Sequence, residues 1–60
     1  MKIQFRYETG NDSIDWIEDY PESPRVGDYI ELPDGTEAQA TTRTWIKTDS
    51  GRQLLITLED

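Results

Sequence analysis

Hydrophobic and polar residues alternate along most of this chain, which is the pattern of half-buried β-strands. Ile30 and Leu32 alternate with polar neighbours just before residues 33–35, which read Pro-Asp-Gly. These three residue types suit a type I turn followed by a residue with positive φ. The pattern therefore predicts a three-residue hairpin loop that places Leu32 opposite Thr36 and Ile30 opposite Ala38.

Residues 49–51, Asp-Ser-Gly, give a second turn signal of the same kind. The same loop geometry predicts that Ile46 lies opposite Leu54 and that Thr44 lies opposite Ile56. Both registers place the even-numbered residues on one side of the sheet, because side chains alternate along a strand. The predicted apolar face consists of Ile30, Leu32, Ala38, Ala40, Ile46, Leu54, Ile56 and Leu58, with Thr42 and Thr44 in its middle.

The odd-numbered residues of these hairpins are mostly polar, as on a solvated face. Tyr29, Trp45 and Leu55 are the exceptions. The predicted register places Trp45 directly opposite Leu55, as a cross-strand apolar pair on the polar side of the sheet.

The N-terminal segment alternates in the same way, with Ile3, Phe5 and Tyr7 between polar residues. This indicates a strand that extends the sheet beside a hairpin edge. Residues 8–13 have a loop composition. For residues 13–20 two interpretations stay open: a strand that pairs back on the first one, which we favour, and a short helical turn capped by Asp12 or Ser13.

Two prolines within residues 20–24 indicate an extended connector. The expected fold is therefore all-β: one small domain over residues 1–60, with an antiparallel sheet of four to five strands, bent or closed toward an SH3-like barrel. One short helical turn near residues 13–20 is the open alternative.

The composition argues against several classes of function. The chain has no His and no Cys, and thirteen acidic against six basic residues give a net charge of −7. We expect no direct nucleic-acid binding and no membrane association, because phosphate contacts need Lys and Arg and no apolar run is long enough to span a bilayer. The cytoplasm is the default compartment.

No motif in the sequence indicates a catalytic site. Residues 11–22 place oxygen-bearing side chains at most ligand positions of a calcium loop, but Trp16 stands where that loop needs glycine. A solvated acidic loop is the preferred interpretation. Carboxylate pairs such as Glu18 and Asp19 lack a pocket, and the serines lack a histidine base. We expect no enzymatic activity, cofactor or metal.

The expected function is a non-catalytic interaction module that binds a protein partner, which the charge suggests is basic. An exposed aromatic patch flanked by basic residues is typical of binding hot spots, and the candidate residues are Tyr29, Arg43, Trp45 and Leu55. Burial of Trp45 beneath the N-terminal segment is the preferred interpretation of that residue, since large aromatic side chains usually serve the core. A free sheet edge and a homodimer through Trp45 and Leu55 are further options.

The alternative function is inhibition by charge. Small acidic inhibitors from phages and mobile elements are similar in size and charge, and they block the basic groove of a nucleic-acid-binding protein. The acidic surface expected to act in this way comprises Asp15, Glu18, Asp19 and Glu22.

Overall fold

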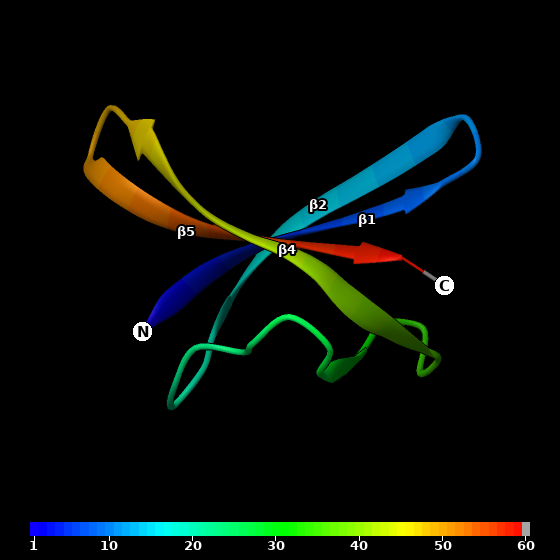
Figure 1. Cartoon of the computed structure of the whole chain (residues 1–60). Coiled ribbons are helices and arrows are strands. Elements are labelled where there is room, and N and C mark those ends of the chain that lie inside the picture. The colour runs from blue at the N-terminus through cyan, green and yellow to red at the C-terminus, as the bar shows by residue number, and fades with distance from the viewer. Residues whose placement is uncertain (60) are drawn as a thin grey trace.

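Five β-strands form one curled sheet in the computed structural model, which describes residues 1–59 (Figure 1). The strands are β1 (Lys2–Thr9), β2 (Asp12–Asp19), β3 (Tyr29–Glu31), β4 (Glu37–Thr48) and β5 (Gly51–Glu59). Their order in the sheet is β2-β1-β5-β4-β3, and the sheet bends into a half-barrel. The described residues contain no helix, so the all-β prediction is confirmed.

The first predicted hairpin, β3–β4, has the expected register. Ile30 pairs with Ala38, and the amide of Gly35 donates a hydrogen bond of 2.9 Å to the carbonyl of Leu32. Gly35 has a φ of 91°, which a residue with a side chain rarely adopts. The hydroxyl and amide of Thr36 both donate to the Asp34 carboxylate and hold its pKa below the usual value.

The register predicted for the second hairpin, β4–β5, is wrong. Thr48 pairs with Gly51, so the turn has two residues instead of three, and Trp45 pairs with Leu54 instead of Leu55. The Thr48 hydroxyl explains the tighter turn, because it donates to the Gly51 carbonyl at 3.0 Å and accepts from the Ser50 amide at 3.2 Å. These bonds close the loop one residue earlier than the turn sequence alone predicts.

A β-bulge in β4 changes which side chains face the core. Ala40 pairs with Leu58, whereas Thr42 pairs with Thr57, so Thr41 is the extra residue. The Thr41 hydroxyl donates to the Thr57 carbonyl at 3.3 Å. Before the bulge the even-numbered residues of β4 face inward, and after it the odd-numbered residues do, because one inserted residue reverses the alternation.

The N-terminal hairpin confirms the strand interpretation of residues 13–20 and excludes the helical turn. β1 and β2 pair antiparallel with Phe5 opposite Trp16, and their rings stack with centroids 5.4 Å apart. The loop predicted over residues 8–13 is shorter than expected, since both strands continue to a turn at Gly10 and Asn11. Gly10 has a φ of 53°, which suits the first central position of a type II′ turn.

The first and last strands run side by side and join the two halves of the sheet. β1 pairs with β5 in parallel, with Ile3 beside Leu54 and Phe5 beside Ile56. The core lies on the inner, concave face of the half-barrel. It consists of Ile3, Phe5, Ile30, Leu32, Ala38, Ala40, Leu54, Ile56 and Leu58, with Tyr7, Trp16 and Tyr20 packed against it. Ile46 is only partly buried and does not join this cluster, because the bulge turns it to the outer face.

The connector between β2 and β3 covers one end of the core. Pro24 is buried, and the ring of Tyr20 lies 5.2 Å from that of Phe5. Burial raises the pKa of the Tyr20 phenol, and the nearby carboxylates of Glu18 and Glu31 raise it further. The half-barrel is therefore closed at the connector and left uncovered at the β4–β5 hairpin (Figure 1).

Candidate protein-interaction surface

The β4–β5 hairpin carries a basic and aromatic group on the inner face of the sheet, which begins beside the core and continues to the hairpin tip. Arg43 pairs with Ile56, Trp45 with Leu54, and Lys47 with Arg52, and directly opposed residues share a face. We call Arg43, Trp45, Lys47 and Arg52 the hairpin patch. Trp45 is 50% exposed, so half of its surface is accessible to a partner.

The contacts around Arg43 fix one end of the hairpin patch. Its guanidinium carbon lies 5.9 Å from the ring centroid of Trp45, within the range of a cation–π interaction. The guanidinium also donates a hydrogen bond of 2.9 Å to the hydroxyl of Ser23 in the connector. Arg43 therefore links the patch to the covered end of the core and restrains the indole.

The other end of the patch holds two unneutralised positive charges. Lys47 and Arg52 are directly opposed, and within residues 1–59 neither forms an ion pair. Like charges in this arrangement destabilise a sheet unless an anion lies between them. This end of the hairpin is therefore locally positive.

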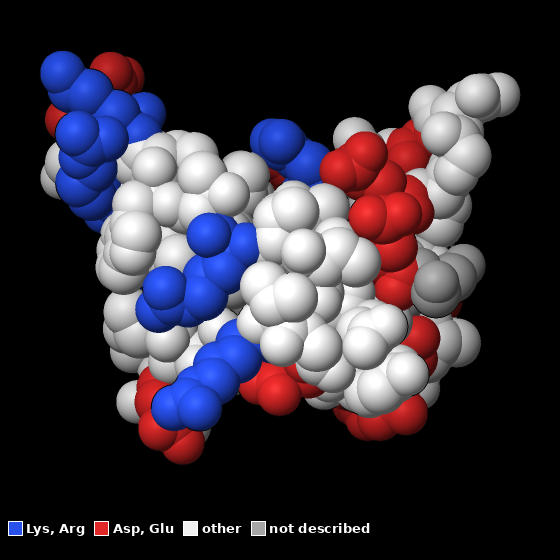
Figure 2. Space-filling view, in the orientation of Figure 1, with Lys and Arg blue, Asp and Glu red and all other residues white. Residues whose placement is uncertain are grey.

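The basic side chains are concentrated on one part of the surface. In Figure 2, they occupy the left and centre of the view, including the β4–β5 hairpin tip, where acidic atoms lie beside them, and most other acidic side chains gather on the right and lower edges. The chain has a net charge of −7. The basic part is therefore a local feature of an acidic molecule.

Two of the predicted patch residues lie elsewhere. Leu55 is only 8% exposed and, opposite Thr44, faces the outer side of the sheet, away from Trp45. Tyr29 is 67% exposed and lies on β3 opposite Gln39, also on the outer face. The preferred interpretation of Trp45 as a buried residue is wrong, because no segment of residues 1–59 closes over the hairpin. Of the predicted set, the structure brings together only Arg43 and Trp45.

Arg52 belongs to the patch, although it is not among the residues predicted from the sequence. Its position opposite Lys47 follows from the two-residue turn and not from the three-residue turn that the sequence predicted. The signal that could have identified it is Thr48, whose hydroxyl closes the turn.

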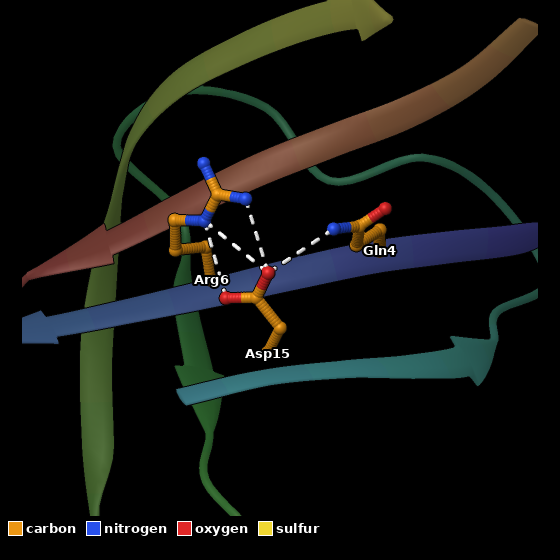
Figure 3. Close-up of polar contacts among 3 residues, drawn as sticks. All are labelled: Gln4, Arg6 and Asp15. Atoms are coloured by element: carbon orange, nitrogen blue, oxygen red, sulfur yellow. Dashed lines mark hydrogen bonds and ion pairs between the residues drawn. The ribbon is translucent and has the colours of Figure 1, made fainter. Parts of the chain in front are cut away.

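Among the predicted acidic residues, Asp15 is held in an ion pair on the outer face. Arg6 donates a hydrogen bond of 3.1 Å from Nε to Oδ1 of Asp15 and one of 3.0 Å from Nη2 to Oδ2. The side-chain amide of Gln4 also donates to Oδ2, at 3.2 Å (Figure 3). The hydrogen bonds from Arg6 lower the pKa of Asp15, and the same contacts raise the pKa of Arg6. Asp15 is thus partly neutralised by a residue from the neighbouring strand.

The four predicted acidic residues do not form one surface, although Asp15 and Asp19 share the outer face of β2. Asp19 pairs with the N-terminal ammonium at 3.0 Å, whereas Glu18 points to the other face of β2 and accepts a hydrogen bond of 3.2 Å from the Trp16 indole. Glu22 is exposed in the connector. The segment expected to be an acidic loop forms a strand, and a strand sends successive carboxylates to opposite faces.

Within residues 1–59, no group of three or more His, Cys, Asp and Glu side chains is arranged to hold a metal ion. In the described part of the chain, no helix has the length and apolarity needed to cross a membrane. An open hollow of about 500 Å³ lies between the connector and β3 and is lined by residues 20–25 and 28–30.

Comparison of the chain with protein-family models, curated proteins and solved structures finds no match. The function is therefore inferred from the geometry of the hairpin patch.

Proposed function

We propose that this chain is a non-catalytic protein-interaction module that docks on a partner protein through the hairpin patch. The observation that supports the proposal is the half-exposed Trp45 indole, restrained by Arg43 on a hairpin that extends beyond the core. Tryptophan and arginine are the residue types most enriched in binding hot spots. A restrained side chain also loses less conformational entropy on binding than a mobile one.

The site favours an acidic partner surface, in contrast to the basic partner that net charge suggested. Three of the four patch residues are cationic, and none of the three forms an ion pair within residues 1–59. A carboxylate placed between Lys47 and Arg52 would relieve their repulsion. The apolar contact with Trp45 then provides affinity that salt does not screen.

Inhibition by charge is the second candidate. Its support is the net charge of −7 and the acidic side of the molecule in Figure 2. Two of the four residues selected for it, Asp15 and Asp19, are engaged in ion pairs, which reduces the charge they offer to a basic groove.

Partner capture from a lysate of the host separates the two candidates. Tagged wild-type protein is compared with Trp45→Ser, with Tyr29→Ser, and with a Glu18→Lys, Glu22→Lys double variant, after circular dichroism has shown that each is folded. Tyr29→Ser is the matched control, because Tyr29 is an exposed aromatic residue outside the patch.

Docking through the patch predicts a partner that is lost with Trp45→Ser and kept with the other two variants. Loss with the charge-reversed double variant alone would support inhibition by charge. A partner retained equally by all three variants would refute both candidates.

A further inference from the structure

The outer edge of β4 is open along the hairpin patch. β4 runs from Glu37 to Thr48, but β3 pairs with only its first residues, Glu37 to Gln39. Two more hydrogen bonds, both of 2.8 Å, join Ala40 to the backbone of Gly27 and Asp28. Beyond Ala40, no strand of residues 1–59 pairs with this edge of β4.

The backbone groups of the patch residues point toward the open edge. In an antiparallel ladder, directly opposed residues alternate between pairs that exchange hydrogen bonds and pairs that do not. Thr48 and Gly51 flank a two-residue turn and so form the first bonded pair. The alternation then directs the amides and carbonyls of Thr44 and Ile46 toward β5. Those of Arg43, Trp45 and Lys47 face outward.

One stretch of β4 thus offers both backbone and side-chain recognition. The residues whose backbone faces outward are also the residues whose side chains lie on the inner face with Arg52. A strand added at this edge would pair with their backbone and place alternate side chains beside theirs. Arg43 and Lys47 would then flank acidic side chains of the added strand, and Trp45 an apolar one.

We propose that the open edge of β4 binds an extended acidic segment of a partner protein by strand addition, with acidic residues beside Arg43 and Lys47 and an apolar residue beside Trp45. This inference rests on the proposed function and specifies its mode of binding. Charge complementarity selects the partner, because Lys47 and Arg52 are directly opposed and neither has an ion pair within the described residues.

The size of the patch limits the occupant to a short segment. The molecule outside the patch is acidic, and Figure 2 shows acidic side chains at the right and lower edges of the same view. A long polyanion such as a nucleic acid would extend beyond the basic residues onto these carboxylates. A segment with two or three acidic residues matches the local charge without that penalty, since screening limits its interactions to roughly 8 Å at physiological salt.

A blocked synthetic peptide of sequence TETVTET tests this inference by NMR. On binding, the amide protons of Arg43, Trp45 and Lys47 should exchange more slowly with solvent, because they gain acceptors in the peptide. Those of Thr44 and Ile46 are already bonded to β5 and should change little. Replacing both glutamates with glutamine should weaken binding, and raising the salt concentration should do the same.

N-methylated peptides show whether the peptide backbone takes part. One peptide carries methyl groups on the valine and glutamate amides, and the other carries them on the threonine amides. An added strand bonds through one of its edges only, so one set of methyl groups should abolish binding and the other should preserve it. Equal binding of both peptides would overturn strand addition.

Two protein variants complete the test. Lys47→Pro removes an outward-facing amide without removing a bond to β5, and Lys47→Ala removes the same charge but keeps the amide. Strand addition predicts loss of peptide binding with Lys47→Pro and only weakening with Lys47→Ala. If capture of the protein partner depends on Trp45 while Lys47→Pro and the peptide leave it unaffected, the module function stands and strand addition fails.

Other occupants of the edge would also overturn the inference. Protection of the Arg43, Trp45 and Lys47 amides in the free protein that disappears on dilution would assign the edge to a second copy of this chain. Tighter binding of an oligothymidylate than of the acidic peptide would assign the patch to nucleic acid.

Discussion

Trp45 lies directly opposite Leu54, on the face of the sheet that holds the core, yet half of its surface is exposed. The bulge at Thr41 produces this arrangement by reversing the alternation of β4. If β4 continued from the Ala40–Leu58 pair without the bulge, Trp45 would lie opposite Gln53 and the indole would point to the outer face. An extra residue in one strand thus decides on which side of the sheet the candidate binding residue lies.

The register of the second hairpin can be tested by NMR. Opposed residues that do not exchange hydrogen bonds bring their Cα atoms to about 4.5 Å. We expect a strong contact between the Hα protons of Trp45 and Leu54. A strong contact between Trp45 and Leu55 instead would support the register predicted from the turn sequence and contradict the structure.

The two tryptophans should differ in solvent access. Trp16 stacks on Phe5, whereas Trp45 is 50% exposed. In a Trp16→Phe variant, which retains only Trp45, we expect red-shifted fluorescence that iodide or acrylamide quenches efficiently. A Trp45→Phe variant should show blue-shifted and less quenchable emission from Trp16. Equal quenching of the two variants would mean that the hairpin is covered.

Core burial predicts that substitutions at two isoleucines change the free energy of unfolding by different amounts. Ile56 is fully buried at the centre of the sheet, and Ile17 is 60% exposed on the edge strand β2. Ile56→Val should lower the free energy of unfolding by about 1 kcal/mol, because it removes a methylene from a packed site. Ile17→Val should change it by less than about 0.5 kcal/mol. Urea denaturation of the pair measures both values.

The Arg6–Asp15 ion pair should contribute a pH-dependent part of stability. The pKa of Asp15 is lowered in the folded state, so its contribution is present above the unfolded value, about 3.9, and is lost as pH falls through the folded value. The difference in unfolding free energy between wild type and Asp15→Asn should therefore be constant near neutral pH and decline in acid. A difference that persists in strong acid would assign the effect to something other than this carboxylate.

Gly35 should resist substitution because of its backbone conformation. Its φ is 91°, and a Cβ atom built on it meets no atom within 4 Å, so strain and not crowding opposes a side chain. We expect Gly35→Ala to cost about 1–2 kcal/mol. Gly35→Asn should cost less, since asparagine tolerates positive φ better. Thermal unfolding that finds the two variants equal would contradict this explanation.

Most of the fold could be predicted from local patterns. The Pro-Asp-Gly turn fixed the register of Ile30 with Ala38, and alternation identified the strand that contains Trp16. The parallel pairing of β1 with β5 could not be predicted, because it joins segments at opposite ends of the chain and no turn sequence encodes it. The candidate site could be predicted only in part.

The errors at the site have one physical origin. The hydroxyls of Thr41 and Thr48 stabilise a bulge and a shorter turn, respectively, and neither feature alters the alternation of polar and apolar residues in the sequence. In the sequence, a threonine at a bulge cannot be distinguished from a threonine elsewhere in a strand. Arg43 and Trp45 were identified as candidates, but their face and their neighbour Arg52 depend on these two local bonds.

The parallel contact between β1 and β5 also determines when the molecule can fold. Ile3 and Phe5 are fully buried only when Leu54 and Ile56 lie beside them. During synthesis Phe5 therefore remains only partly covered, by Trp16 of its own hairpin, until residues 51–59 have left the ribosome. A chain dominated by such distant contacts folds slowly for its size. The chain is therefore most vulnerable to proteolysis and aggregation before β5 has been synthesised and has paired with β1.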